Sequence, residues 1–512
     1  MNIEAAKRRS ETEFFMKKAT ALLLTLIMLV AMLASCSDRG NGTTTTAPTG
    51  NEDTPSDTAA ATVDANGYVL DDIPELNFNE TVINILMWND YTMTEFYDVN
   101  GNGDLIGQAI TDRNSRVEKR LGVKLEFIEI PGSTSAAQKA YIQKVNADAA
   151  LAPACEYDIY ATYSRTPAQL ALQGYTANLL DTQYFNVEKP WWPKALMNEC
   201  TINNKLYFCS GDISTNLLWM MIGTFYNKNL LKTYNIEKSP YDLVKSNEWT
   251  FDKMAEMVKD IYEDGGDGKK SSDDKFGYVI YDVNIDAFQT AAGTVSISKD
   301  ESGELIISPD FSGERQINMV SKVHQLLESD GVYQTNSIKI RNVFFEERAL
   351  MITDRVFIVA GKDNRDDKNR IEFDYGIVPQ PKYSADQENY MTNVGHPYTM
   401  YAINVSSSKI DECSAVLEAM GSENYRSVTP KVFEAAMKVR YASNSEAGEM
   451  YDIIRAGISF DLGRLFAETF GNHTANLFRK NAISGSSYST QYNIAKPVIE
   501  AGLELIKRGF DK

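Results

Sequence analysis

The alternation of strand and helix patterns between residues 81 and 162 constrains the fold most strongly. The first pattern is a continuous apolar run at 82–88, VINILMW, as expected for a strand that is covered on both faces. Apolar residues then recur at helical spacing as far as Leu121, where Gly122 can end the helix. A strand, a helix and a strand follow in turn, at 123–130, from Ser135 and at 158–162. This order predicts a parallel sheet with right-handed crossover connections.

A second set of elements follows residue 212. Apolar runs predict strands at 217–226, 276–281, 349–352, 375–379 and 400–404. Thr250 is placed to cap a helix whose inner face carries Met254 and Val258. From Asp411 to the end the pattern is mainly helical, and no internal repeat is visible. The chain is therefore predicted to be an α/β protein with more sheet than one βαβαβ unit contains.

The amino-terminal segment resembles an export signal with a lipid anchor. Lys17 and Lys18 precede an uncharged apolar run at 19–33, which is typical of a secretory signal peptide. The run ends in Leu-Ala-Ser-Cys at 33–36, which resembles the lipobox of bacterial lipoproteins, in which the cysteine is lipidated and becomes the first mature residue. Residues 1–35 are therefore predicted to be the signal peptide and Cys36 the lipidation site. Three glutamates before Met16 suit a signal poorly, which favours Met16 as the true start.

The alternative for this segment is a transmembrane helix, because 19–37 carries no charge and about twenty apolar residues span a bilayer. That reading leaves the cysteine unexplained. After Cys36 the chain is rich in Thr, Gly, Ala, Pro and Asp, so 36–80 is predicted to be a flexible linker. The folded part would then begin near Thr81.

The net charge limits the classes of binding partner, and the cysteine content limits the possible disulfide bonds. The chain carries a net charge of −19, and removal of residues 1–35 takes away five basic and three acidic residues, which leaves −21. Such an acidic chain is unsuited to a nucleic-acid partner or to anionic lipid. Four cysteines besides Cys36 are too few for a disulfide scaffold. A bond between Cys200 and Cys209 across a turn at Asn203-Asn204 would join diagonal neighbours, which lie too far apart for easy bridging, so this pairing stays open.

The order of several short motifs resembles the extracellular solute-binding proteins of ABC importers, in particular the carbohydrate-binding group that includes maltose-binding-like lipoproteins. The motifs are spread over most of the mature chain: the lipobox at Cys36, Tyr157-Asp158-Ile159, Trp191-Trp192, the segment 202–207, Tyr226-Asn227-Lys228, Trp249-Thr250, 345–351 and the Tyr-Gly-Ile-Val-Pro run at 375–379. One departure is the Asn pair at 203–204, where a glycine is usual. Asn tolerates positive φ, so the turn can still form.

The resemblance implies a two-lobed periplasmic-binding-protein-like (type II) fold, with a hinge and a ligand cleft between the lobes. It places 81–209 and 351–408 in the first lobe and 210–350 and 409–512 in the second. It also implies an ABC transporter permease as partner, a carbohydrate as ligand, membrane attachment through the lipid alone and a monomeric protein. No cofactor and no metal are expected.

A sugar has an apolar face and a rim of hydroxyls, so its site needs aromatic planes together with side chains that both donate and accept hydrogen bonds. Such residues occur at the predicted strand ends, where ligands of parallel sheets bind. The candidate ligand-binding residues are Trp88, Asp90, Tyr91, Tyr163, Arg165, Asp212, Trp219, Arg355, His396 and Tyr398. For Trp219, which lies in an apolar run, a core position is the favoured interpretation.

Other chemistry finds little support. The segment 98–109 begins like a calcium loop but has Ala109 in place of the bidentate glutamate. The segment 263–271 resembles both a calcium loop and a P-loop. It lacks the first glycine of the P-loop motif, so nucleotide binding is not predicted, whereas calcium binding stays an open alternative. Three scattered histidines offer little for zinc.

The sequence therefore predicts a receptor without catalysis. By the family resemblance it captures a carbohydrate, expected to be an oligosaccharide, and delivers it to a permease. Two alternatives stay open. One is a surface-anchored polysaccharide hydrolase, which needs two carboxylates about 5 to 10 Å apart across a cleft. The other is a surface glycan-binding protein that serves adhesion without transport.

Overall fold

The computed structural model describes residues 62–91, 94–98, 104–360, 371–440 and 445–511. The predicted signal peptide, Cys36 and most of the predicted linker lie outside these residues. None of the described helices combines the length and the apolar character that a bilayer crossing requires.

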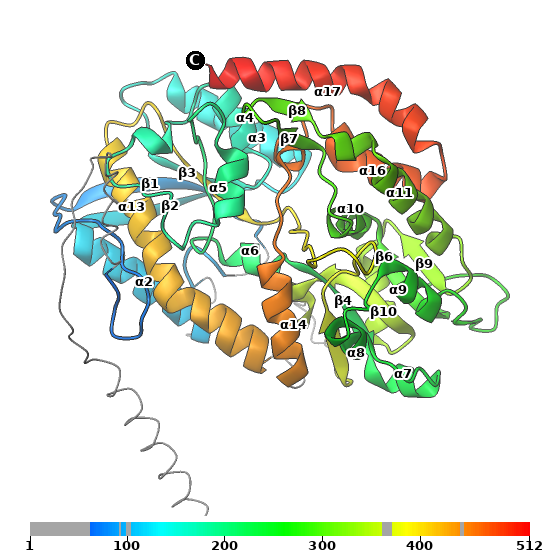
Figure 1. Cartoon of the computed structure of the whole chain (residues 1–512). Coiled ribbons are helices and arrows are strands. Elements are labelled where there is room, and N and C mark those ends of the chain that lie inside the picture. Colours follow the sequence, from blue (N-terminus) through cyan, green and yellow to red (C-terminus); the bar gives the residue numbers. More distant parts are fainter. Residues whose placement is uncertain (1–61, 92–93, 99–103, 361–370, 441–444, 512) are drawn as a thin grey trace, which may run out of the picture. The chain divides into compact units, whose positions relative to one another are not determined.

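The first sheet contains the predicted βαβαβ unit (Figure 1). Its strand order is β12-β3-β1-β2, and β1 pairs in parallel with both β2 and β3. The fourth strand, β12, runs antiparallel to β3. The strands are β1 Thr81–Trp88, β2 Val123–Ile130, β3 Ile159–Tyr163 and β12 Thr399–Ile403. The predicted parallel arrangement is confirmed.

The two crossover helices begin and end where the sequence indicates. In α2, Leu105–Leu121, the side chain of Asp104 accepts hydrogen bonds from the first amides, and Gly122 ends the helix in the left-handed conformation at φ 62°. In α3, Ser135–Ala149, the Thr134 hydroxyl accepts from the amide of Ala137. These caps fix the length of each crossover and so fix where β2 and β3 begin.

The second sheet has the strand order β11-β4-β10-β6-β5, with β9 also paired to β6. Strand β10 is parallel to β6 and antiparallel to β4, and β11 is antiparallel to β4. The bounds are β4 Ile222–Asn227, β5 Tyr262–Glu263, β6 Lys275–Tyr281, β9 Val332–Thr335, β10 Ala349–Arg355 and β11 Tyr375–Val378. A small hairpin pairs β7 Ile297–Lys299 with β8 Leu305–Ile307.

The strand predicted at 217–226 is partly wrong. Its first part forms a short helix, α6 Thr215–Trp219, and the strand proper is β4. All five residues of α6 are buried, so the segment is apolar throughout, and a continuous apolar run cannot distinguish a buried helix from a buried strand. Within α6 the Asn216 side chain bonds to the buried Glu95 carboxylate, which anchors this turn beside the first sheet.

The strand pairing also divides the chain differently from the expected lobe boundaries. Strands β10 and β11, which lie within or next to the segment 351–408 assigned to the first lobe, are hydrogen-bonded to β4 in the second sheet. From that segment only β12 joins the first sheet. Likewise α13, Ile410–Glu423, was assigned to the second lobe but packs against α2. Sheet membership is decided by pairing partners far away in the sequence, which local patterns do not reveal.

The α-helices surround the sheets and form much of the carboxyl-terminal part that the structure describes (Figure 1). The prediction of a mainly helical segment from Asp411 is confirmed by α13, α14 Ser445–Ala456, α15 Leu462–Leu465, α16 His473–Ser484 and α17 Tyr488–Phe510. Helix α17 packs against α16, α4 and β8. The other helices are α4 Pro167–Leu172, α5 Lys194–Cys200, α7 Lys228–Thr233, α8 Pro240–Lys245, α9 Phe251–Val258, α10 Asp286–Ala291, α11 Glu314–Leu327 and α12 Arg341–Phe345.

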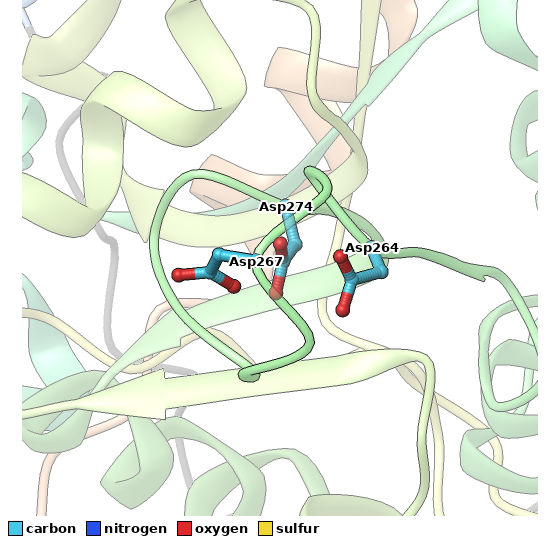
Figure 2. Close-up of side chains that lie close together, drawn as sticks. All are labelled: Asp264, Asp267 and Asp274. Atoms are coloured by element: carbon cyan, nitrogen blue, oxygen red, sulfur yellow. The ribbon is translucent and has the colours of Figure 1, made fainter.

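The acidic loop between β5 and β6 brings three carboxylates together. Oxygens of Asp264, Asp267 and Asp274 lie within 4.8 Å of one another (Figure 2). Asp274 is buried and accepts hydrogen bonds from the amides of Gly265 and Ser271 at 2.7 and 2.8 Å. Asp264 accepts from two further amides of the same loop. These bonds account for the carboxylate positions as parts of a glycine-rich turn, the interpretation that competes with calcium binding for this segment.

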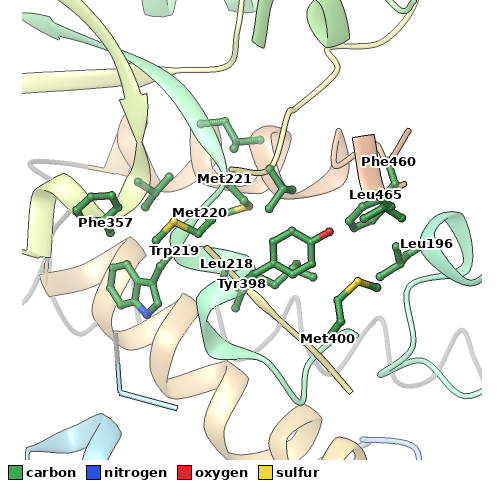
Figure 3. Close-up of a cluster of buried hydrophobic side chains, with 14 of the residues drawn as sticks. Leu196, Leu218, Trp219, Met220, Met221, Phe357, Tyr398, Met400, Phe460 and Leu465 are labelled. Atoms are coloured by element: carbon green, nitrogen blue, oxygen red, sulfur yellow. The ribbon is translucent and has the colours of Figure 1, made fainter. Parts of the chain in front are cut away.

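A buried apolar cluster joins segments from both sheets (Figure 3). Trp219 is the last residue of α6 and Met220 follows it, Tyr398 precedes β12 and Met400 lies in it, and Leu465 ends α15. All five residues are buried. The Met220 carbonyl also accepts the amide of Gly395 at 2.8 Å. The cluster therefore packs α6, β12 and α15 against one another.

The cysteines within the described ranges, Cys155, Cys200, Cys209 and Cys413, are free thiols. The turn at Asn203-Asn204 forms as predicted, with φ values of 50° and 57° and paired bonds between Ile202 and Lys205. Cys200, however, ends helix α5, and Cys209 pairs with Tyr401 beside the first sheet. The two sulfurs thus belong to different elements.

Candidate functional site

A pocket of about 350 Å³ lies where strands of the two sheets end. The carboxyl end of β3 contributes Tyr163 and Arg165, the end of β6 contributes Tyr281, and the end of β10 contributes Arg355. This is the location expected for a ligand of open α/β sheets. The remaining lining residues are Ile222, Val283, Asn284, Asp286, Ile338, Asn393, Gly395, His396, Arg464, Ala475, Asn476 and Arg479.

The wall from the first sheet is built on Trp88. The Trp88 ring is fully buried, and its Nε1 donates to the Thr399 hydroxyl at 2.8 Å. The Tyr163 ring meets it edge-on, with 5.4 Å between the centroids. Trp88 therefore supports the lining residue Tyr163 from behind and does not itself face the pocket.

The wall from the second sheet carries Arg355 at the end of β10. Its neighbour Asp354 is fully buried and forms a two-pronged ion pair with Arg341, at 2.6 and 2.9 Å. The Arg355 guanidinium lies against Gly395, where a Cβ atom would come within 2.6 Å of its Nε. A side chain at residue 395 would thus displace Arg355, which explains a glycine at this place in the lining.

A third wall comes from α10, α15 and α16. Arg464 and Arg479 both donate to the same Oδ2 atom of Asp286, at 3.2 and 2.6 Å. The turn before Arg464 is held by Asp461, which accepts from the amides of Ser296 and Gly463 at 2.9 Å each. Asp461 thereby fixes α15 to the β7 strand region and points Arg464 toward Asp286.

Several polar atoms in the lining are buried without a partner among the described residues. They include the Nε atoms of Arg165 and Arg355 and the Oδ1 atoms of Asn284, Asn393 and Asp286. Buried polar atoms normally have a hydrogen-bond partner, and leaving one unpaired costs about 1–3 kcal/mol. The cluster of such atoms in one pocket is what a site for a polar ligand requires.

His396 lies among the arginines of the pocket. Its Nε2 is 3.3 Å from a guanidinium nitrogen of Arg464, which can only donate, so Nε2 carries the lone pair and the ring is neutral. Its Nδ1 faces the Ser164 hydroxyl at 3.4 Å. Burial, and then the charges of Arg464, Arg165, Arg355 and Arg479, hold the pKa of His396 well below its ordinary value.

This pKa shift predicts a stability loss in mild acid. In the unfolded chain His396 binds a proton below about pH 6.5, whereas the folded ring stays neutral, so the unfolded state gains protons as the pH falls. The free energy of unfolding should therefore drop by up to about 2 kcal/mol between pH 7 and 5 because of this residue. Urea unfolding at each pH measures it.

The control is His396→Gln, and the informative quantity is its difference from the wild type. Glu199 and Glu418 act in the opposite sense, because burial raises the pKa of each carboxyl to about 7, and their effect cancels in that difference. A difference between the two proteins that stays constant over this pH range would contradict the assignment.

The structure brings four of the ten predicted site residues into the pocket: Tyr163, Arg165, Arg355 and His396. Tyr398 is buried beside it, in a small adjoining cavity of about 20 Å³ that shares His396 and Arg464. Trp88 and Tyr91 lie one layer behind, because Tyr91 packs edge-on against Trp88 with 6.2 Å between the centroids.

Three predicted residues have other roles in the structure. Asp90 accepts from the amides of Gly132 and Ser133 at about 3 Å and so fixes the loop after β2. Asp212 lines a different pocket and bonds to Thr429 at 2.7 Å. Trp219 is fully buried in the apolar cluster of Figure 3, the core position that its sequence context also allowed.

Sequence reasoning missed the third wall and the amide side chains. Arg464 lies between apolar residues in the run LGRLF, but Arg479 is followed by Lys480 in NLFRKNAI, so neither run distinguishes a pocket residue from a solvent-facing arginine. Asn284 and Asp286 lie in the turn after β6, three and five residues beyond its last residue, so a wider strand-end rule could have selected them.

The chain resembles known proteins both in sequence and in fold. A family model described as bacterial extracellular solute-binding protein matches residues 108–425. No curated protein matches the sequence. Among solved structures, a cyclo/maltodextrin-binding protein complexed with maltotetraose aligns with a TM-score of 0.54 at 11% identity, covering 82% of this chain and 97% of that one.

Two further solved structures are similar. The cyclic alpha-maltosyl-1,6-maltose binding protein from Arthrobacter globiformis aligns with a TM-score of 0.52 at 13% identity, over 84% of this chain and 100% of that one. UgpB from Mycobacterium tuberculosis, in complex with glycerophosphocholine, aligns with a TM-score of 0.51 at 12% identity, over 82% and 98%. At these identities the similarity shows the fold, which is two-lobed and of the periplasmic-binding-protein type.

Proposed function

The chain belongs to the bacterial extracellular solute-binding proteins, and from this premise we propose that it captures a carbohydrate and delivers it to an ABC transporter permease. The observation that carries the proposal is the pocket at the ends of β3, β6 and β10. It offers two tyrosine rings, Tyr163 and Tyr281, and three amide side chains, which is the combination that a sugar ring with its hydroxyls needs.

Proteins of the same fold support a saccharide ligand by analogy. The solved structures named above include one in complex with maltotetraose and one named for a cyclic maltosyl-maltose ligand. The pocket volume lies at the lower end of the range for small-molecule sites, so the conformation described here suits a short saccharide or the end of a longer one.

Capture would proceed by closure of two lobes, one built on each sheet. The pocket draws its walls from both sheets, so a ligand there contacts both lobes at once. A ligand shifts a conformational equilibrium by its extra affinity for one state, and contacts to both walls exist only when the lobes are together. The segments that connect the sheets, including 379–398, would serve as the hinge.

Attachment to the outside of the cell membrane through lipid on Cys36 is part of the proposal and rests on the sequence at 33–36. Acyl chains contribute about 0.8 kcal/mol for each buried methylene, so two or more chains hold a protein at a surface. The linker after Cys36 would let the folded part reach solute and permease while it remains attached.

The pocket favours this receptor over a polysaccharide hydrolase. Its lining contains one carboxylate, that of Asp286, and this carboxylate already accepts hydrogen bonds from Arg464 and Arg479. Hydrolysis of a glycosidic bond uses two carboxyl groups facing each other across the substrate. Among the described residues the pocket therefore lacks the second group.

A thermal-shift screen with saccharides tests the function. A bound saccharide at one hundred times its Kd should stabilise the native state by about 2.7 kcal/mol and raise the melting temperature accordingly. Small-angle scattering of the same samples should show a smaller radius of gyration if closure accompanies binding. Mannitol, an acyclic polyol, is the control for an effect of hydroxyl-rich solutes in general, and a response to mannitol equal to that of every saccharide would contradict specific capture.

A further inference from the structure

The charge of the pocket exceeds what a neutral sugar needs. Four arginines line it, namely Arg165, Arg355, Arg464 and Arg479, against the single carboxylate of Asp286. The pocket thus has an excess of three positive charges, within a chain whose net charge is −19. A surplus of positive charge in an acidic protein is a local feature of this site and not a consequence of composition.

The one carboxylate is divided between two of the arginines. Arg464 and Arg479 donate to the same oxygen of Asp286, whose other oxygen is buried and has no partner in the part of the chain that the structure describes. Each of these guanidinium groups is therefore only partly neutralised. Both are also well shielded from water, with side-chain exposures of 11% and 17%.

The other two arginines have no ion pair among the described residues. Arg165 bonds to the neutral amide of Asn472, and Glu468 attracts it without forming an ion pair. The carboxylate next to Arg355 in sequence, Asp354, is occupied by Arg341. The Nε atoms of Arg165 and Arg355 are buried without partners, and burial lowers the pKa of both groups.

Such an arrangement is costly for an empty site. A buried charge that has no counter-charge destabilises the folded state, and neighbouring like charges repel one another. His396, neutral and surrounded by the same four groups, cannot supply the missing negative charge. An anion in the pocket would remove both the repulsion and the unpaired donors, and guanidinium groups bind carboxylate and phosphate with paired hydrogen bonds.

We propose that the captured solute is anionic: a sugar that carries a carboxylate or phosphate group, bound by Arg165 and Arg355 of the pocket. This inference rests on the proposed function for the saccharide part of the ligand and on the arginines for its charge. Tyr163, Tyr281 and the amides of Asn284 and Asn393 would contact the uncharged part. Carboxylate and phosphate present similar oxygens to a guanidinium, so the probes below separate them.

The first experiment needs no knowledge of the ligand. Inorganic phosphate, added to the purified protein at constant ionic strength against chloride, should raise the melting temperature of the wild type. The double variant Arg165→Met/Arg355→Met should melt at or above the temperature of the wild type without phosphate, because it lacks two uncompensated charges, and should lose the phosphate response. An equal phosphate response in both proteins would overturn the proposal.

The second experiment compares saccharides that share a ring but carry a neutral or an anionic group at carbon 6: glucose with glucuronate and glucose 6-phosphate, and galactose with galacturonate. In titration calorimetry the charged member should bind about 10- to 100-fold more tightly, and Arg355→Met should abolish that advantage while Arg355→Lys restores part of it. The relative affinity of the uronates and the phosphate ester identifies the anionic group. Arg508→Met, which changes an exposed arginine of α17, is the matched control and should bind as the wild type does.

The outcomes separate the two proposals. Neutral sugars that bind as tightly as their charged partners would overturn the anionic ligand and leave carbohydrate capture intact. An arginine-dependent phosphate response without binding of any saccharide would support the anion site and overturn carbohydrate capture.

Discussion

Replacement of Asp354 by alanine is expected to lower the free energy of unfolding by about 3–5 kcal/mol, one of the two largest effects that the structure predicts. Asp354 has no exposed side-chain surface, and Arg341, which pairs with it, is 6% exposed. Removal of the carboxylate takes away both hydrogen bonds that the buried Arg341 guanidinium makes to Asp354. The amide of Arg355 also loses its acceptor, which lies 2.7 Å away. Urea unfolding of the purified variant measures the loss.

Two variants control this result. Glu449→Ala breaks the ion pair with Lys245, at 2.8 Å, in which both side chains are about half exposed, with values of 53% and 52%. That change should cost less than about 1 kcal/mol. Asp354→Ala combined with Arg341→Met removes both buried charges and should recover much of the loss. A cost for Asp354→Ala no greater than that for Glu449→Ala would show that the pair is not desolvated as the structure indicates.

The Asp354–Arg341 pair matters for the site as well as for stability. Because Arg341 takes up the charge of Asp354, the adjacent Arg355 keeps its own charge for the pocket. A protein that needed only stability could pair Arg355 with Asp354 and leave position 341 apolar. The use of a second arginine to occupy the carboxylate is consistent with a pocket that accumulates positive charge.

The first sheet could be predicted from sequence because its signals are local. The apolar run of β1, the helical spacing in α2 and the capping residues Asp104 and Gly122 each depend on neighbours in the chain. The segment at 217–226 failed because its buried helix and buried strand are equally apolar. Short-range sequence patterns predict the elements well but do not predict their pairing partners. Strands β10 and β11 illustrate this, because both pair with β4 of the second sheet although most of their residues were expected in the first lobe.

The site was predictable where it follows a strand and hidden where it does not. Tyr163 and Arg165 follow β3 directly, and Arg355 is the last residue of β10, so the strand-end rule finds them. Arg464 and Arg479 reach the pocket from α15 and α16, near the carboxyl terminus. The placement of α15 depends on the hydrogen bond between Asp461 and Ser296, two residues that are 165 positions apart in the sequence. A lone arginine in a helix is most often solvent-exposed, so nothing local marks these two.

Trp88→Ala is expected to lower the free energy of unfolding by about 3–5 kcal/mol and to weaken ligand binding. Trp88 is fully buried, so truncation leaves a cavity behind Tyr163, whose ring packs edge-on against it at 5.4 Å, and the first-sheet wall of the pocket loses its support. Trp219→Ala is the matched control, because Trp219 is also fully buried but is not one of the residues that line the pocket. It should lose a similar stability while the folded protein keeps its affinity within about threefold, since only the lost transfer and cavity terms apply to it. Urea unfolding gives the stabilities and titration calorimetry below the melting transition gives the affinities. If both variants bound ligand alike, Trp88 would be a core residue only, and the wall formed by Tyr163 would stand without it.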